Sequence, residues 1–379
     1  MIQIAEISGR KELRKFVSFA IQLYKDNDCY VPPLIEDEVD TLDRTKNPAL
    51  RFCDSVYYIA KDESGNVLGR IAGFINPRYN SKSGDNLCRF GFVDFVDDKE
   101  VSRALFDAVS EWGRKKGMTS LAGPLGMTDL DYEGALTDGF DQLGTMSTIY
   151  NYPYYIDHFK AYGMEEDAVW SEFLIPIPEK ITDKHLRVAE FVRTRCGLRS
   201  FSETNRKRLR EKYGHQIFEL LNVCYSQLYC VSELDDAQIQ YYLDKYLPLL
   251  PLECIRLVAN ADDELVAFAV TCPSMARAQQ KAKGRLLPFG WYHLLKALKL
   301  KGGTDIWDLM LIGVRPDYQG KGVTALIFTD MIQMGLKRGL KVVSAYPQLT
   351  TNTKVREQWK YFDYKINSTR ATFKIKFQK

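Results

Sequence analysis

The chain has 379 residues, of which 45% are hydrophobic and 27% are charged, as in an ordinary soluble globular protein. Its formal net charge of +3 is spread along the sequence, so we expect no polyanion-binding surface and no nucleic-acid partner. The length favours two domains of ordinary size over a single one.

The spacing of apolar residues predicts helices and strands that alternate along the chain. Both halves carry the order hairpin, strand, helix, strand, which indicates a duplicated unit. We predict an α/β protein of two domains, 1–178 and 179–379, each a mixed, mostly antiparallel sheet flanked by helices. Helices are predicted at 10–26, 99–116, 185–195, 212–228, 236–246 and 320–337, and strands at 55–61, 67–76, 87–95, 119–122, 254–259, 265–271, 305–314 and 341–346.

Several features bear on the compartment and on metal ions. The first residues, Met-Ile-Gln-Ile-Ala-Glu, are charged too early for a signal-peptide core. No stretch approaches the roughly 20 apolar residues that span a bilayer, so we expect a cytoplasmic protein without stable membrane insertion. Eight cysteines without a Cys-x-x-Cys pair predict reduced thiols. Four histidines without paired spacing predict no metal site.

The strand at 305–314 runs into a glycine-bearing turn that opens the helix at 320–337. Unpaired N–H groups at a helix start, together with the helix dipole, suit a pyrophosphate, and Lys321 adds a cation at the rim. Pro316 ends the strand because proline cannot donate to the ladder. An ordinary glycine-capped strand-to-helix turn is the alternative.

The run from Val314 through Pro316 and Gln319 to Gly322 resembles the acetyl-CoA-binding motif of the GNAT acyltransferase superfamily. Gly123-Pro124, Asp138-Gly-Phe-Asp141, Asn151-Tyr-Pro-Tyr-Tyr155 and the run 284–290 extend the likeness to an uncharacterised bacterial family of tandem GNAT-like proteins. The resemblance implies two tandem GNAT-like domains, the second of which binds acetyl-CoA or another acyl-CoA. Its motif implies cofactor contacts at Leu311, Ile312, Val314, Gln319, Gly320, Lys321, Gly322, Val323, Thr324 (in place of a small residue) and Asn352.

The same resemblance suggests catalytic groups. Asp308 stands where histone-acetyltransferase-type members carry a glutamate base, although a solvated hairpin carboxylate is an equal alternative. The position expected for the tyrosine that protonates the leaving thiolate holds Trp359. Tyr361, two residues later, is a candidate acid that the helical geometry does not favour, and Tyr346 or Tyr318 are other candidates.

The first half carries Asp97-Asp98-Lys99-Glu100-Val101-Ser102 where a phosphate loop would lie, and these carboxylates would repel a pyrophosphate. We therefore expect one cofactor per chain. The loop 123–155 is rich in acids and aromatics and lines an acceptor site or covers the domain junction. In the first case Glu133 and Asp138 could bind a cationic amine.

The insertion 275–301 is basic and amphipathic. The sequence leaves three arrangements open for it. The segment could lie on a membrane surface or cover an acyl chain, and packing as a helix at the domain interface is the commoner arrangement.

The sequence thus predicts a GNAT-type N-acyltransferase, of the N-acetyltransferase kind, that moves an acyl group from acyl-CoA to a small amine. A non-catalytic acyl-CoA-binding protein is the main alternative because the expected tyrosine is missing. An aminoacyl-tRNA-dependent transferase is a third, since some of those also use tandem GNAT-like halves. A tandem pair favours a monomer over a homodimer.

Overall fold

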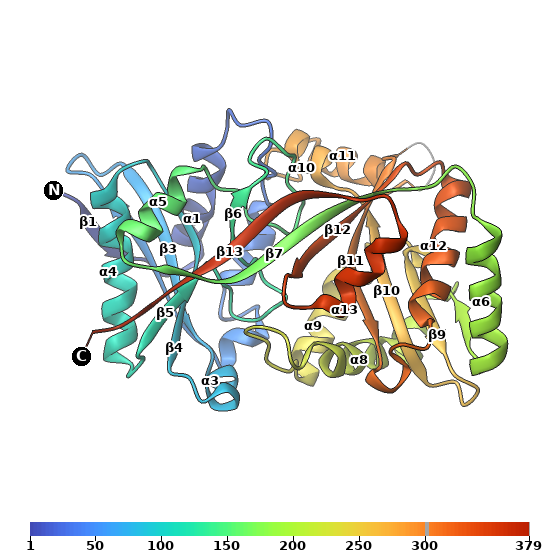
Figure 1. Ribbon diagram of the computed structural model, residues 1–379. Coiled ribbons are helices and arrows are strands. Elements are labelled where there is room, and N and C mark those ends of the chain that lie inside the picture. Colours follow the sequence, from blue (N-terminus) through green and yellow to red (C-terminus); the bar gives the residue numbers. More distant parts are fainter. Residues whose placement is uncertain (300–302, 379) are drawn as a thin grey trace.

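The computed structural model describes residues 1–299 and 303–378, apart from the side chains of residues 184, 354 and 361. Its strands form one continuous sheet through both halves of the chain (Figure 1). The strand order is β1-β2-β3-β4-β5-β13-β7-β12-β11-β10-β9-β8, and β6 pairs with β13 off this path. Neighbours are antiparallel except for β4 with β5 and β11 with β12. The predicted mixed, mostly antiparallel α/β architecture is confirmed, with the two sheets fused into one.

The first half has a hairpin, a strand, a helix and a strand, followed by a short helix and a long strand. Its elements are β1 (Gln3–Glu6), α1 (Arg10–Leu23), α2 (Ile35–Leu42), β2 (Asp54–Lys61), β3 (Val67–Ile75), α3 (Pro77–Ser83), β4 (Leu87–Phe95), α4 (Lys99–Lys115), β5 (Ser120–Gly123), β6 (Ala135–Asp138), α5 (Tyr154–Ala161) and β7 (Glu165–Pro176).

The second half repeats this order and adds an insertion between β10 and β11. The predicted boundary at 178/179 falls just after β7 and stays a prediction. The elements are α6 (Asp183–Cys196), β8 (Arg199–Phe201), α7 (Arg206–Arg208), a π-helical turn (Leu209–Gly214), α8 (His215–Tyr225), α9 (Asp236–Tyr246), β9 (Ile255–Ala259), β10 (Leu265–Pro273), α10 (Ala276–Ala282), α11 (Gly290–Ala297), β11 (Ile306–Val314), α12 (Val323–Arg338), β12 (Val342–Leu349), α13 (Thr353–Arg356) and β13 (Lys365–Lys376).

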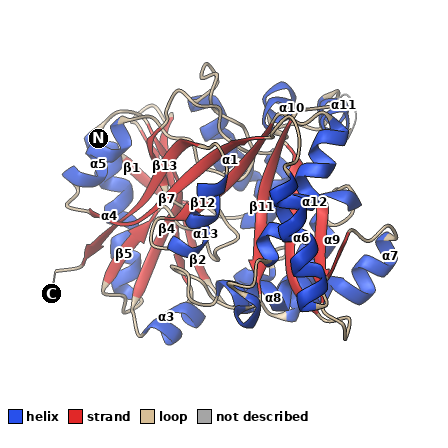
Figure 2. Cartoon of the chain, turned by 45° about the vertical axis from the view of Figure 1, so that its right-hand side comes forward, coloured by secondary structure: helices blue, strands red, loops and turns tan. Residues whose placement is uncertain are grey.

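Two hydrophobic cores lie on opposite faces of the C-terminal strands. Side chains alternate along β10, so Ala267 and Ala269 face the core under α6 and α12, while Phe268 faces the core under α8 and α9. Figure 2 shows α6 and α12 side by side over the C-terminal strands. The sheet in this half is therefore covered on both faces, and a ligand reaches its strands only where they separate.

The last long strand of each half crosses into the other half. β13 pairs with β5 and β6 of the first half, and β7 pairs with β12 of the second half. The two crossing strands also pair with each other along most of their length (Figure 1). No strand was predicted at β13, although Ala371, Phe373 and Ile375 alternate with polar residues and pack in the core of the first half. Its other face buries Ser368, Arg370 and Thr372.

A buried ion pair joins the crossing strands. Glu172 of β7 and Arg370 of β13 are each 2% exposed, and the Arg370 guanidinium donates to the Glu172 carboxylate. Arg370 also donates to the carbonyl oxygens of Ile149 (2.5 Å) and Gly134 (3.5 Å). The pair therefore ties both strands to the loops of the first half.

We predict that Arg370→Met lowers the free energy of unfolding by about 3–5 kcal/mol, because it leaves the Glu172 carboxylate buried without a partner. The double variant Glu172→Leu/Arg370→Met should recover part of this loss. Lys341→Met, which breaks the exposed pair of Lys341 with Asp305, is the matched control and should cost about 0–1 kcal/mol. Urea unfolding measures all three, and equal losses for Arg370→Met and Lys341→Met would contradict the prediction.

Candidate functional site

The strands β11 and β12 separate partway along their length. Their parallel pairing covers Ile306 to Leu309 and Val342 to Ala345. Beyond this point β11 continues to Val314 beside β10, and β12 has a bulge between Ala345 and Gln348. Beyond Leu309 the edge of β11 that faces β12 is therefore not paired with β12. Side chains occupy part of it: the Tyr225 hydroxyl donates to the Ile312 carbonyl at 3.3 Å, and Gln319 Nε2 donates to the Val314 carbonyl at 3.2 Å.

The predicted phosphate turn lies at the open end of this fork. Gly320 (φ 75°) and Gly322 (φ 80°) take left-handed conformations, and α12 begins at Val323. A Cβ added at Gly320 would meet no atom within 4 Å, so an anion can approach the backbone there. The first turn of α12 holds no acidic residue. Its first hydrogen bond runs from the Ala325 amide to the Gly322 carbonyl at 3.0 Å, so the N–H groups of Val323 and Thr324 precede the helical hydrogen-bond ladder. Lys321 is exposed, with its Nζ 4.8 Å from the Tyr318 ring centre.

Asp308 lies inside the paired part of β11, with none of its surface exposed. Tyr346 on β12 donates its hydroxyl to the Asp308 Oδ2 at 3.5 Å. The other oxygen, Oδ1, makes no hydrogen bond within the described part of the chain. Burial raises the pKa of Asp308 to about 7, and burial together with the Asp308 charge raises the pKa of Tyr346 well above 10.

A cavity of about 390 Å³ opens at the fork and lies between the two halves. Its inner wall is formed by Met310 and Leu311 of β11 and Tyr346 of β12. Gln279 of α10 also lines the cavity. Most of the remaining lining is apolar or aromatic. It comprises Pro33, Leu34, Thr41, Phe92, Leu130, Tyr132, Met146, Ser147, Trp170, Ile217, Phe218, Tyr225, Tyr242, Leu243, Tyr246, Leu247, Leu250, Ile255, Val270 and Pro347.

The cavity wall also carries carboxylates. All of them come from the first half, and no lysine, arginine or histidine is among the described residues that line the cavity. Glu133 Oε1 is buried and has no hydrogen-bond partner within the described residues. Burial raises the pKa of Glu133 well above its usual value and that of Asp129 to about 6. The five acidic residues are Asp37, Glu38, Asp129, Asp131 and Glu133.

The structure separates the other predicted site residues. Asp138 is exposed at the end of β6 and does not line the cavity, in contrast to Glu133. Asn352 caps α13 and is half-buried. Trp359 is buried, and its Nε1 donates to Gln348 Oε1 at 2.8 Å, so the position expected for a tyrosine belongs to the core. Tyr361 ends a 3₁₀ turn, and its side chain lies outside the described residues.

The equivalent fork in the first half is closed. The amide of Leu125 donates to the Phe90 carbonyl of β4 at 2.7 Å. A Cβ at Gly91 would lie 2.3 Å from the Leu125 carbonyl oxygen, so the closing segment fits only against a glycine. The helix that follows, α4, begins with Asp98 as its N-cap and Glu100 in its first turn. Both the plugged fork and these carboxylates oppose an anionic cofactor.

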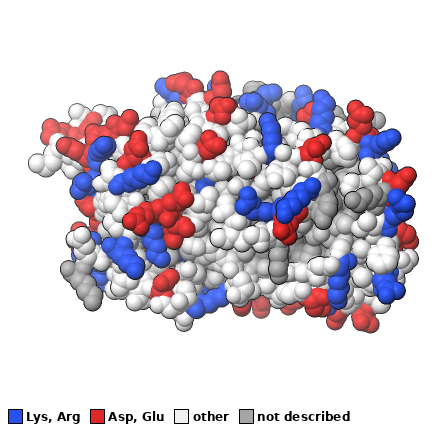
Figure 3. All heavy atoms as spheres, in the orientation of Figure 1, with Lys and Arg blue, Asp and Glu red and all other residues white. Residues whose placement is uncertain are grey.

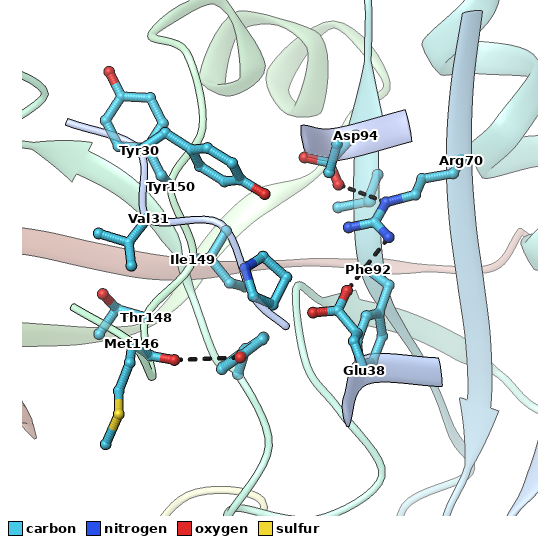
Figure 4. Close-up of a pocket in the computed structure, with 14 residues that line it drawn as sticks. Tyr30, Val31, Glu38, Arg70, Phe92, Asp94, Met146, Thr148, Ile149 and Tyr150 are labelled. Carbon is cyan, nitrogen blue, oxygen red and sulfur yellow. Dashed lines mark hydrogen bonds and ion pairs between the residues drawn. The ribbon is translucent and has the colours of Figure 1, made fainter. Parts of the chain in front are cut away.

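Beyond the closed fork lies a cavity of about 60 Å³ (Figure 4). There Arg70 lies between Asp94 (2.8 Å) and Glu38 (3.4 Å), and the three side chains are nearly buried. Glu38 and Phe92 line both cavities, so the smaller one adjoins the larger. The first half therefore places the buried charged group of Arg70, Asp94 and Glu38 next to the cavity between the halves.

The buried Asp308 makes stability depend on pH. In the unfolded chain its pKa is about 3.9, so between pH 4 and pH 7 the unfolded state releases a proton that the folded state keeps. Stability therefore falls as the pH rises through this window. We predict that Asp308→Asn, which removes the carboxyl, gains stability relative to the wild type by up to about 4 kcal/mol between pH 4.5 and pH 7.5. Urea unfolding at several pH values measures this difference, and a flat difference would contradict it.

Comparison with known proteins agrees with this architecture. No protein-family model matches the chain. It is 27% identical to Protein YghO of Escherichia coli K12, over 86% of this chain and 82% of that protein. It is 25% identical to a bacterial ceramide synthase of Caulobacter vibrioides, over 84% of this chain and 82% of that protein.

Two solved structures share the fold at low sequence identity. A tandem GNAT protein from the clavulanic acid biosynthesis pathway is 12% identical, with a TM-score of 0.55 over 99% of this chain and 98% of that chain. A GCN5-related glucosamine N-acetyltransferase region of a fungal β-N-acetylglucosaminidase is 10% identical, with a TM-score of 0.60 over 99% of this chain and 38% of the other. The duplicated element order, the fork and these likenesses agree, and the chain has the fold of a tandem GNAT protein.

Proposed function

We propose that this chain is an N-acyltransferase of the GNAT type, which transfers an acyl group from acyl-CoA to an amine. One observation carries the proposal. The fork between β11 and β12 meets a glycine turn at one end and an acid-lined cavity on its inner side. A donor with a pyrophosphate and an acceptor with a cationic nitrogen would therefore meet at Met310, Leu311 and Tyr346.

The donor side follows from the backbone. The N–H groups at the start of α12, from Gly320 to Thr324, would hold the pyrophosphate, and Lys321 would add a positive charge. The edge of β11 beyond Leu309 would bind the extended arm of coenzyme A through backbone hydrogen bonds, in place of its present contacts with Tyr225 and Gln319. Amides near Leu311 to Gly313 would polarise the acyl carbonyl, because charge develops on that oxygen during amine attack.

The acceptor side follows from the cavity wall. An ammonium group would give Glu133 Oε1 a partner, which favours a cationic amine over a neutral or anionic acceptor. Asp308 does not line the cavity, so a proton would pass from the ammonium to Asp308 through the Tyr346 hydroxyl. The neutral nitrogen then forms a bond to the acyl carbon as the carbon–sulfur bond breaks. The nitrogen gives up a second proton, the departing thiolate takes one up through solvent, and the products are the amide and the coenzyme A thiol.

The lining favours an amine with an apolar body. Aromatic and aliphatic side chains of α8 and α9 form most of the wall beside the carboxylates. One relative is a bacterial ceramide synthase, and a ceramide is a fatty amide of a long-chain amine. We therefore propose an acceptor that combines one ammonium group with an apolar chain, in place of a small amino-acid-like amine, and a donor that is acetyl-CoA or a longer acyl-CoA.

We predict that Gly320→Glu weakens acyl-CoA binding at least about tenfold, because a carboxylate would occupy the anion site at the start of α12. Gly339→Glu is the matched control: this glycine lies at the other end of α12, has φ 73°, and also has no atom within 4 Å of an added Cβ. Calorimetric titration with acetyl-CoA and with a long-chain acyl-CoA measures both variants. Equal affinities for the two variants would exclude the turn as the phosphate site.

Turnover tests the acyl-transfer reaction itself. Thiol release from acyl-CoA should depend on added long-chain amine. Asp308→Asn should lower kcat by about 10²-fold or more, with unchanged affinity for acyl-CoA. Glu133→Gln should raise KM for the amine, whereas Asp138→Asn, outside the cavity, should change neither constant. Acyl-CoA binding without thiol release on any amine would support the non-catalytic acyl-CoA-binding protein instead.

A further inference from the structure

The insertion between β10 and β11, residues 275–299, exposes an unusual number of large apolar side chains; we refer to it as the α10–α11 insertion. Leu287 is 75% exposed and Phe289 is 70% exposed, in the loop that leads into α11. Within α11, residues 291, 292 and 295 share one helical face. Single exposed apolar residues are ordinary, but a contiguous group marks an interaction surface. The group comprises Leu286, Leu287, Phe289, Trp291, Tyr292 and Leu295.

The charge of the same segment has one sign. The α10–α11 insertion has no aspartate or glutamate, although the chain as a whole is nearly neutral. In Figure 3 lysine and arginine side chains lie over the edge of the molecule where α10 and α11 are found. Within the insertion itself, the exposed apolar group is thus flanked along the sequence by basic residues and by no acidic ones. The basic residues are Arg277, Lys281, Lys283, Arg285, Lys296 and Lys299.

The inner side of the insertion is fixed to the first half of the chain. Gln280 Nε2 donates to the backbone carbonyls of Asp28 (2.8 Å) and Tyr30 (2.9 Å). The Ile35 amide donates to the Gly284 carbonyl at 2.9 Å. These hydrogen bonds hold α10 and Gly284 against the first half, and the exposed apolar side chains follow directly after them in the chain. Packing at the domain interface, one of the alternatives given by the sequence, thus describes α10, and the membrane-surface alternative stays a prediction for α11.

We propose that the α10–α11 insertion docks on the surface of a lipid bilayer that contains anionic lipids. Leucine and phenylalanine would enter the apolar boundary of the bilayer, while the lysines and arginines would contact the headgroups. Tryptophan and tyrosine favour the interface between the headgroups and the apolar boundary. The indole N–H of Trp291 donates to the Pro288 carbonyl at 3.0 Å, so this polar group has a partner within the chain. Lysine is depleted in protein–protein interfaces, so this composition favours lipid over a second copy of the chain.

The docking is peripheral. No described helix is long and apolar enough to cross a membrane. Gln279 of α10 lines the cavity between the halves. Gly284 lies against Pro33, and Pro33 also lines that cavity. The surface and the cavity therefore share a structural element. A lipid-like acceptor or product would travel a short path between the bilayer and the cavity, although docking itself does not depend on acyl transfer.

Vesicle flotation of the full chain tests the proposal. The wild type should float with vesicles of equal parts phosphatidylcholine and phosphatidylglycerol, and much less with phosphatidylcholine alone or at high salt. Leu287→Ser/Phe289→Ser should lower the bound fraction at least about tenfold. Lys296→Glu/Lys299→Glu should abolish the preference for anionic vesicles.

Phe191→Ser/Leu249→Ser is the matched control, because these side chains are 63% and 62% exposed elsewhere on the molecule. This variant should float as the wild type does. The proposal is overturned if the wild type does not bind anionic vesicles, or if the α10–α11 variants bind them equally well. It is also overturned if sedimentation shows that Leu287→Ser/Phe289→Ser only converts a dimer into monomers, since a second copy would then be the occupant.

Discussion

The pairing of β7 with β13 holds the whole molecule together. Each strand leaves its own half and completes the sheet of the other, so neither half has a finished sheet without its partner. The buried pair of Glu172 and Arg370 fixes the crossing, because a shift of one residue would bury one charge without the other. The position of the cavity depends on this crossing, since Trp170 of β7 and Tyr346 of β12 belong to its wall.

The two halves share one element order but differ at the fork between their parallel strands. In the second half the fork is open, its turn carries Gly320 and Gly322, and α12 begins without acids. In the first half Leu125 fills the fork and Asp98 caps the next helix. The closed half nevertheless supplies every carboxylate of the cavity wall. Under the proposed function, the donor side would thus come from one half and the acceptor side from the other.

Local patterns predicted the strand at 87–95, the helix at 236–246 and the turn before α12, because apolar spacing and glycines encode them directly. The wall of the cavity could not be predicted, since its segments are far apart in sequence and meet only through the sheet order. The contact of Tyr346 with Asp308 depends on the register of two parallel strands. The alternation of Ala371, Phe373 and Ile375 could have marked β13 as a strand, but its pairing across both halves, with a buried polar face, could not be predicted from it.

The crossing also constrains how the chain folds as it leaves the ribosome. Residues 1–176 emerge before the second half, yet β5 and β6 must wait for β13, which begins only at Lys365. Until then the edge of β5 offers unpaired N–H and C=O groups to any neighbouring chain. The first half is therefore a nascent domain with an open edge, whose closure comes from β13, a strand that follows those of the second half.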